Sequence, residues 1–226
     1  MNISIDKQEV LRYLGHRGQE LEPEMAGLVD DCIEQTLRLI QPRWVYRRFP
    51  LQREGDKLRL GDSQVMLRGS DIVSHLKASR ECVLMAVTIG SAIETEIRRS
   101  EYTQLSRSLI LDSCATTAVE AVCDAVEEEI RALAAREGNT ITWRYSPGYG
   151  DFGIDIQKTF LRLLDAEKKI GLCASNSSIL IPRKSVTAVI GILPPGAHAN
   201  AKRGCEACAN RERCVYRKNG GTCGSI

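Results

Sequence analysis

The amino-acid sequence predicts an α+β fold built on an antiparallel or mixed β-sheet. Stretches with the apolar spacing of long helices are mixed with short runs typical of strands, and the two kinds of element do not alternate as regular β-α-β units. Residues 82–89 form one continuous apolar run rich in β-branched side chains, which indicates a buried central strand. The order of the elements and this strand together favour the α+β class.

The N-terminal part of the chain predicts two helices followed by strands. Asp6 is placed to cap a short helix, and Pro23 begins a longer helical pattern. This pattern ends before Pro42, because a proline disfavours helix at the residue that precedes it. Residues 44–49 and 64–67 then have the composition of strands.

The middle of the chain predicts a loop and then helices on either side of the central strand. Residues 53–62 are rich in turn-forming residues and predict a loop, and Ser70 predicts the cap of a short helix. After the central strand, Ser91 and Glu94 form a capping-box pattern for the next helix. A long amphipathic helix is expected over residues 103–136.

The last third of the chain predicts shorter elements. We expect a strand at residues 140–144, a helix at 156–169, and two strands at 178–181 and 185–193. Residues 194–196, Pro-Pro-Gly, mark a boundary after which the composition changes. The sequence therefore predicts a folded domain, residues 1–193, and a cysteine-rich basic tail, residues 194–226.

Composition and charge exclude several classes of protein. The apolar fraction of 43% is ordinary for a globular protein, and no stretch approaches the roughly 20 apolar residues that span a bilayer. The N-terminus lacks a secretory signal, so we expect a cytoplasmic protein without a membrane partner. A net charge of +2 argues against nucleic-acid binding by the main domain.

The segment from Arg144 to Gly153 contains the strongest candidate for a ligand site. Residues 148–153 match the dinucleotide pattern G-x-G-x-x-G, but the acidic residues about 20 positions later fall in a helix instead of at a strand end. Pro147 followed by Gly148 is typical of a type II turn, and Arg144 offers a planar set of donors suited to a carboxylate. The residues by themselves leave a ligand turn and a structural β-turn with a surface arginine equally open.

Several segments resemble the activation (reactivation) domain of cobalamin (vitamin B12)-dependent methionine synthase. Residues 144–149, RYSPGY, resemble the Arg-x-x-x-Gly-Tyr segment with which that domain holds S-adenosylmethionine. Residues 163–168 resemble its Leu-Leu-(acidic)-x-Glu-Lys stretch, and residues 178–186 resemble a pair of its strands. The resemblance covers roughly residues 80–193. It implies a bent sheet with long helices, as in the methionine synthase activation domain.

The resemblance implies a stand-alone reactivation module for methionine biosynthesis. Such a module binds S-adenosylmethionine and supports reductive methylation of cob(II)alamin on a partner, with an electron donor such as flavodoxin or ferredoxin. The partner would be a methionine synthase core or another corrinoid protein, because this chain contains no Asp-x-His-x-x-Gly cobalamin signature. The chain would be one component of a methyltransferase system, and it would contribute positioning instead of acid–base catalysis.

The resemblance also assigns roles to five residues, none of them catalytic. Arg144 would pair with the methionine carboxylate, and Glu120 would meet the amino or cationic part of the ligand. Ser146 and Gly148 would offer backbone contacts, while Tyr149 would line the methyl or adenosine side. The remaining acidic residues of the helices are expected on solvated faces; they are Glu94, Asp112, Asp124, Glu127, Glu128 and Glu129.

Nine cysteines are many for a cytoplasmic chain, and they fall into two groups. Five are isolated in apolar surroundings and are expected to be small core residues: Cys32, Cys82, Cys114, Cys123 and Cys173. The other four form a C-x2-C-x5-C-x8-C pattern: Cys205, Cys208, Cys214 and Cys223. Four thiolates suit zinc or an iron–sulfur cluster, although a reduced tail without metal is the alternative.

Two rival functions remain open at the level of sequence. The basic cysteine-rich segment is compatible with a zinc-tailed interaction or nucleic-acid-binding adaptor that does not bind S-adenosylmethionine. The glycine pattern is compatible with a dinucleotide-dependent oxidoreductase. Each of these two functions is supported by one feature of the sequence. The reactivation module accounts for several segments in the order in which they occur along the chain.

Overall fold

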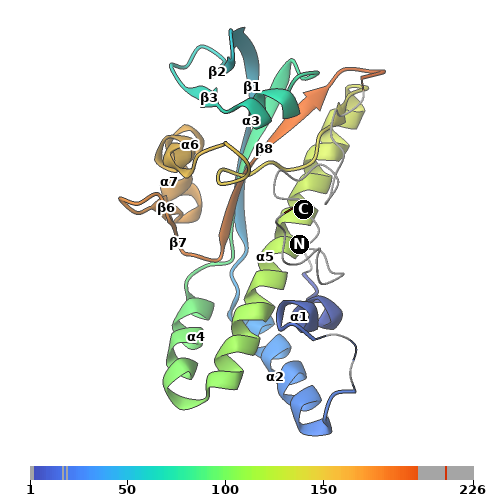
Figure 1. The fold of residues 1–226 in the computed structure, drawn as a ribbon, viewed down its shortest axis with the longest axis vertical. Helices are drawn as coiled ribbons and strands as arrows, with labels where there is room; N and C mark the ends of the chain where they lie inside the picture. The colour runs from blue at the N-terminus through green and yellow to red at the C-terminus, as the bar shows by residue number, and fades with distance from the viewer. Residues whose placement is uncertain (1–2, 17, 19, 198–211, 213–226) are drawn as a thin grey trace.

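The computed structural model describes residues 3–16, 18, 20–197 and 212. Its centre is a curled six-stranded sheet, drawn in Figure 1. In spatial order the strands are β3 (Met66–Arg68), β2 (Lys57–Leu60), β1 (Arg43–Glu54), β4 (Glu81–Thr88), β8 (Ser185–Leu193) and β5 (Thr140–Ile141).

Every strand pair in the described part of the sheet is antiparallel. The long strand β1 pairs with β4 through residues 43–50 and with β2 through residues 51–54. The predicted antiparallel α+β fold is confirmed. Because a dinucleotide-binding β-α-β unit needs parallel strands, the interpretation of residues 148–153 as a Rossmann fingerprint is contradicted.

Two strands were missed in the sequence, β2 and the two-residue strand β6 (Cys173–Ala174). Residues 53–62 were predicted to form a loop, but Lys57–Leu60 forms strand β2 and closes a hairpin with β1. Leu58 and Leu60 alternate along this strand, and both side chains are buried. The short alternation is hidden in the sequence by the polar turn residues around it.

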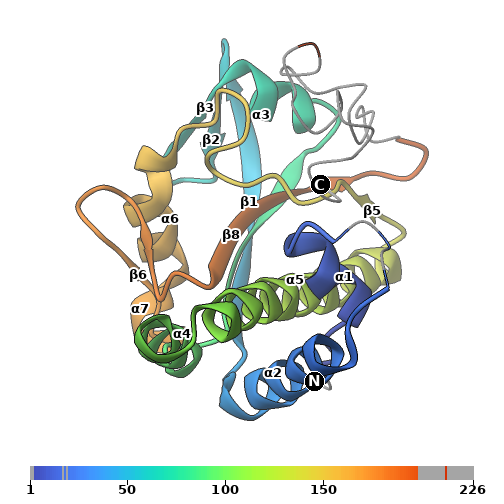
Figure 2. The ribbon, with the colours of Figure 1, turned by 60° about the horizontal axis from the view of Figure 1, so that its bottom comes forward.

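Helices cover both faces of the sheet (Figure 2). One face packs against α1 (Lys7–Tyr13), α2 (Pro23–Leu39), α4 (Ala92–Thr103) and α5 (Leu105–Arg136). The other packs against α3 (Ser70–His75), α6 (Gln157–Leu164) and α7 (Ala166–Ile170). A 3-10 turn, Ile154–Ile156, precedes α6, and a separate small hairpin joins β6 (Cys173–Ala174) to β7 (Leu180–Ile181).

Strand β4 is buried on both faces, as its apolar run predicted. Val83, Met85 and Val87 point to the side of α5, while Leu84 and Ala86 point to the side of α3 and α6. Successive side chains of a strand point to opposite faces, so a strand between two helical layers must be apolar at every position.

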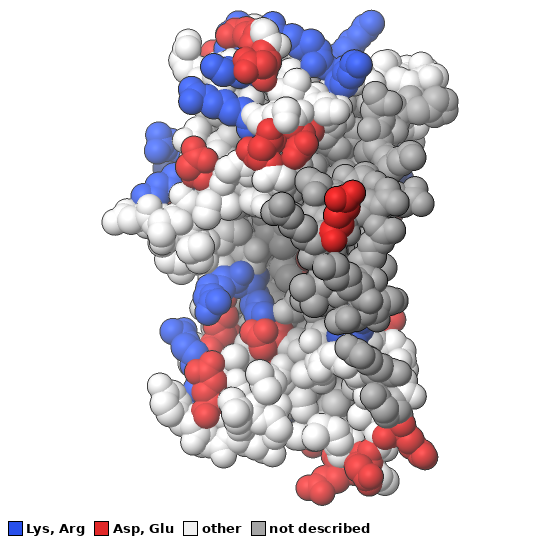
Figure 3. Space-filling view, viewed as in Figure 1, with Lys and Arg blue, Asp and Glu red and all other residues white. Residues whose placement is uncertain are grey.

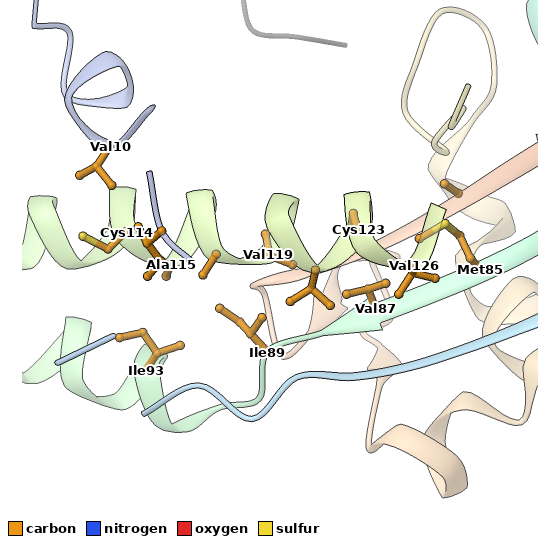
Figure 4. Packing of buried hydrophobic residues seen from close by; sticks show 14 of the residues in the cluster. Val10, Met85, Val87, Ile89, Ile93, Cys114, Ala115, Val119, Cys123 and Val126 are labelled. Atoms are coloured by element: carbon orange, nitrogen blue, oxygen red, sulfur yellow. The ribbon is translucent and has the colours of Figure 1, made fainter. Parts of the chain in front are cut away.

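Helix α5 lies along the sheet through small residues (Figure 4). Ala115 and Ala118 are fully buried, and Figure 4 shows Ala115, Val119 and Val126 on the side of the helix that faces Val87 and Ile89. Cys114 and Cys123 are also fully buried. Short side chains let the helix axis come close to the strands. Cys32 and Cys82 are also buried, while Cys173 is only partly buried, so the expectation of core cysteines holds for four of the five.

Three predicted helix features differ from the structure. The helix expected over residues 103–136 is present as α5 but begins at Leu105, because the extended backbone of Gln104 (φ −157°, ψ 92°) separates it from α4. The helix expected at residues 156–169 is divided at Asp165, which adopts a left-handed conformation (φ 54°). The predicted capping box is not formed: Ser91 makes no side-chain cap bond, and Glu94 accepts the backbone N–H of Lys184 at 2.8 Å.

The predicted division into domain and tail stays a prediction. The boundary coincides with the end of β8 at Leu193, but the cysteines of the tail lie outside the described residues. In the described part of the chain, none of the helices combines the length and apolar content needed to cross a bilayer.

A buried polar group links α3 to the segment that follows β5. His75 Nε2 lies 3.0 Å from the carbonyl oxygen of Trp143 and 2.9 Å from Thr142 Oγ1, which also accepts the backbone N–H of Gly191 at 2.8 Å. Burial lowers the pKa of His75 to about 4. The imidazole is therefore neutral in the folded protein at neutral pH.

This histidine predicts an acid-dependent loss of stability. Between pH 6.5 and 4 the unfolded chain binds a proton at His75 that the folded chain does not, so the free energy of unfolding falls as the pH falls. The loss from this group approaches about 3 kcal/mol. Urea unfolding at pH 7.5, 6 and 5 should show a smaller pH dependence for His75→Gln than for the native protein. Equal dependence in both would contradict the assignment.

Candidate functional site

The segment between β5 and α6 contains the predicted type II turn. Tyr149 N–H donates to the carbonyl oxygen of Ser146 at 3.1 Å across Pro147 and Gly148. Gly148 has φ +102°, a conformation that L-residues rarely adopt, so the turn requires glycine at this position. Two further backbone hydrogen bonds close the loop. Gly148 N–H donates to Phe152 O at 2.6 Å, and Phe152 N–H donates to Tyr149 O at 2.9 Å.

Both ends of this loop are fixed to other elements. Tyr145 exchanges two backbone hydrogen bonds of 2.9 Å with Val189 of β8. At the far end, Asp151 accepts the N–H of Ser70 at 2.6 Å, its hydroxyl at 2.7 Å, and the N–H of Asp71 at 3.0 Å. These bonds, with the Ser70 hydroxyl first, hold the pKa of Asp151 below its usual range. The prediction that Ser70 caps α3 is therefore wrong. Asp151, which lies outside the helix, accepts its first N–H groups instead.

Gly150 allows the close approach of loop and helix. Its φ is +52°, and a Cβ at this position would overlap the Asp71 carboxylate and lie 2.8 Å from the Tyr145 hydroxyl. Asp71 uses that carboxylate to accept the N–H of Asp151 at 3.2 Å. The second glycine of the motif thus serves packing against α3 instead of a dinucleotide phosphate.

Arg144 turns in the opposite direction, toward α5. Its Nη2 donates to Glu120 Oε2 at 3.3 Å, and its Nη1 lies 2.8 Å from Asp124 Oδ1 and 3.1 Å from Glu127 Oε2. The side chain of Arg144 is only 14% exposed. Glu120, Asp124 and Glu127 share one side of the helix because they are four and three residues apart. Figure 1 shows the loop crossing the upper half of α5.

One of these carboxylates was misjudged in the sequence. Asp124 and Glu127 were both expected on solvated helix faces, and Asp124 is indeed 72% exposed, but the side chain of Glu127 is only 9% exposed. Both lie within ion-pair distance of Arg144. Their spacing from Glu120 was the available indication. Glu94 and Asp112 were also expected on solvated helix faces. Asp112 is 53% exposed, and the two residues contact Lys184 through its Nζ (Asp112) and its backbone N–H (Glu94).

The Arg144 side chain has unused hydrogen-bonding capacity. Nη1 is buried and pairs with Asp124 Oδ1 at 2.8 Å and Glu127 Oε2 at 3.1 Å, but its N–H groups are poorly aligned with both oxygens for hydrogen bonding. Glu127 Oε2 is likewise buried without a hydrogen bond in this part of the chain. A carboxylate aligned with the N–H groups of the guanidinium would form stronger hydrogen bonds than these poorly aligned contacts.

Glu120 and Tyr149 complete the group around Arg144. Burial raises the pKa of Glu120, although the positive charge of Arg144 acts in the opposite direction. Burial also raises the pKa of Tyr149, and the charge of Glu120 adds to the effect. The Tyr149 ring meets the Tyr145 ring edge-on, with centroids 5.8 Å apart, and the residue keeps 39% of its surface exposed.

The structure therefore brings the five residues implied by the resemblance into one region. Arg144, Ser146, Gly148 and Tyr149 lie on a single turn, and Glu120 faces that turn from α5. Whether they bind a ligand stays a prediction. Among the residues that the structure describes, no group of His, Cys, Asp or Glu side chains is arranged to hold a metal ion. The four predicted metal ligands of the tail, Cys205, Cys208, Cys214 and Cys223, lie outside those residues.

Charge on this side of the molecule is unevenly distributed. Figure 3 shows charged side chains gathered over the upper strands and at the lower end, where a group of acidic side chains lies at the bottom of the view. Exposed acidic residues of α2 are Glu24, Asp30, Asp31 and Glu34. Because acidic side chains repel phosphate, this end of the described domain does not suit nucleic acid.

Comparison with known proteins identifies the fold. No protein-family model matches the sequence, and no curated protein matches it. The structure is similar to the crystal structure of the MetH reactivation domain bound to AdoHcy, with a TM-score of 0.65 and 17% sequence identity. The alignment covers 96% of this chain and 82% of that chain. The chain thus has a reactivation-domain-like fold, as the resemblance implied.

The crowding around Gly150 predicts a specific sensitivity of the loop. We expect Gly150→Ala to lower the free energy of unfolding by about 2–3 kcal/mol, because left-handed backbone costs an alanine about 1 kcal/mol and the Asp71 contact is also lost. Gly55→Ala is the matched control, since its φ is +61° and its Cβ would meet nothing within 4 Å. Urea unfolding should show a loss of only about 1 kcal/mol for this control. Equal losses in both variants would show that the close approach is unimportant.

Proposed function

We propose that this chain is a reactivation module that binds S-adenosylmethionine and supports reductive methylation of cob(II)alamin on a partner corrinoid protein. The observation that carries the proposal is Arg144, a guanidinium 14% exposed beside a Pro-Gly turn with Nη1 lacking a hydrogen bond among the described residues. The similarity to the fold of the MetH reactivation domain supports the same function.

Arg144 would bind the methionine carboxylate of the ligand. A guanidinium presents parallel N–H donors that match the two oxygens of a carboxylate. The buried Nη1 would gain the hydrogen bond that Asp124 and Glu127 do not provide. The partly buried position strengthens this contact, because water screens it less than at the surface.

Glu120 would bind the positively charged part of the same ligand. Its side chain is 45% exposed and accepts a hydrogen bond from Arg144 Nη2, so it lies next to the expected position of the carboxylate. In S-adenosylmethionine the ammonium group is attached to the carbon that bears the carboxylate. An acidic residue beside the arginine therefore matches the order of charges in the ligand.

The turn would form the remaining wall of the site. Gly148 has no side chain to block the backbone, while Ser146 contributes polar atoms and Tyr149 a ring and a hydroxyl. S-adenosylmethionine supplies a methyl group on a positively charged sulfur. The contribution of these residues would be to hold that group toward the partner, which needs no general base.

The remaining assignments are also proposals. The chain would act apart from the catalytic modules, with the cobalamin carried by a methionine synthase core or another corrinoid protein, and with a flavodoxin or ferredoxin as electron donor. The tail after residue 193 would hold zinc or an iron–sulfur cluster through its four cysteines.

Ligand binding can be tested by isothermal titration with S-adenosylmethionine. We expect Arg144→Ala to weaken binding by about 10-fold to 100-fold, the loss of a charge-assisted hydrogen bond of about 1.5–3 kcal/mol. Arg38→Ala is the control, because Arg38 is 68% exposed and its ion pair is with Glu34 on the same helix. An absence of heat with native protein would refute the proposal and favour the adaptor alternative.

The role in reactivation has a spectroscopic test. The native protein is mixed with a cob(II)alamin-loaded corrinoid protein, a reductant and S-adenosylmethionine, and we expect the methylcobalamin spectrum to appear. Arg144→Ala should slow its appearance at limiting S-adenosylmethionine, because less ligand is bound. Formation of methylcobalamin at the same rate without this chain would contradict the proposed role.

A further inference from the structure

The three carboxylates around Arg144 differ in their freedom to move. Glu127 is 9% exposed, Glu120 is 45% exposed and Asp124 is 72% exposed. All three belong to α5, so the backbone holds their Cα atoms at fixed places. Their differences therefore arise from the side chains and from what surrounds them.

Glu127 is a permanent partner of Arg144. Its Oε1 accepts a hydrogen bond from Arg131 Nη2 at 2.8 Å, and its Oε2 lies buried 3.1 Å from Arg144 Nη1. Without Arg144 this carboxylate would lose much of its charge compensation in a buried position, which is costly. Glu127 therefore stays beside the guanidinium whether or not a ligand is present.

Asp124 has the opposite properties. Its carboxylate lies 2.8 Å from Arg144 Nη1, yet Nη1 makes no hydrogen bond within the described part of the protein. Since most of the side chain is in contact with water, it can leave Arg144 and be solvated at little cost. The Asp124 carboxylate thus lies beside Arg144 Nη1, but the contact is poorly aligned for a hydrogen bond.

We propose that Asp124 is an internal competitor for the carboxylate of the ligand: it pairs with Arg144 in the free protein and is displaced when the ligand binds, while Glu127 stays and positions the guanidinium. This inference rests on the proposed function. It assigns Asp124 a role in limiting affinity and Glu127 a role in positioning.

Three ligands separate this role from general electrostatics. S-adenosylmethionine and S-adenosylhomocysteine both carry the carboxylate, whereas decarboxylated S-adenosylmethionine lacks it and is more positively charged. We expect Asp124→Asn to bind the first two ligands about 2-fold to 5-fold more tightly, as loss of an exposed ion pair implies. The decarboxylated ligand should bind no more tightly, because it does not compete with Asp124.

Glu127→Gln tests the positioning role, and Glu128→Gln is its matched control. We expect Glu127→Gln to weaken binding of both carboxylate ligands by about 5-fold or more and to leave the decarboxylated ligand within about 2-fold. Glu128 is the next residue, 72% exposed, and its ion pair is with Arg131, so its variant should bind all three ligands as the native protein does.

The outcomes are distinguishable from failure of the proposed function. If native protein binds none of the three ligands, the function is refuted, and the displaceable contact is then judged by reaction of Arg144 with phenylglyoxal, followed by peptide mass mapping. Asp124→Asn should speed modification of Arg144 several-fold relative to native protein and Glu128→Gln. If Asp124→Asn weakens binding of the carboxylate ligands, tightens all three ligands equally, or leaves Arg144 modification unchanged, the inference is overturned.

Discussion

The ion pairs between Arg144 and the carboxylates of α5 are the interaction on which the candidate site depends. A guanidinium largely withdrawn from water requires nearby negative charge, and Glu120, Asp124 and Glu127 supply it from one side of a single helix. The pairs join the turn to the helix. Removing the arginine would leave Glu127 buried without adequate compensation, and removing Glu127 would leave the arginine less firmly held, so each side positions the other.

The sheet makes this meeting possible. Helix α5 and β4 share one hydrophobic cluster, and Tyr145, the residue after Arg144, is bonded to β8, the neighbour of β4. The separation of the arginine from the helix is thus set by two adjacent strands. Asp151 fastens the other end of the loop to α3 on the opposite face. A site built on such elements keeps its geometry better than one on a free loop.

The fold and the site support the function in different ways. A TM-score of 0.65 at 17% identity shows that the architecture of the MetH reactivation domain is shared, but a fold by itself does not specify a ligand. The chemical argument comes from the order of charges: an arginine with an unused donor, an adjacent half-exposed glutamate, and a glycine turn beside them. That order matches the carboxylate and ammonium of an amino acid.

The sequence by itself determined the features whose causes are local. Pro147 and Gly148 specify a type II turn, and β4 is buried because it is apolar on both faces. Only the tertiary structure decided which charges meet. Glu94 became the acceptor of a backbone N–H 90 residues away, and Glu127 became a buried partner of Arg144 and not a solvated residue. A turn is governed by its own backbone angles, whereas the burial and pairing of a charge depend on elements that only folding brings together.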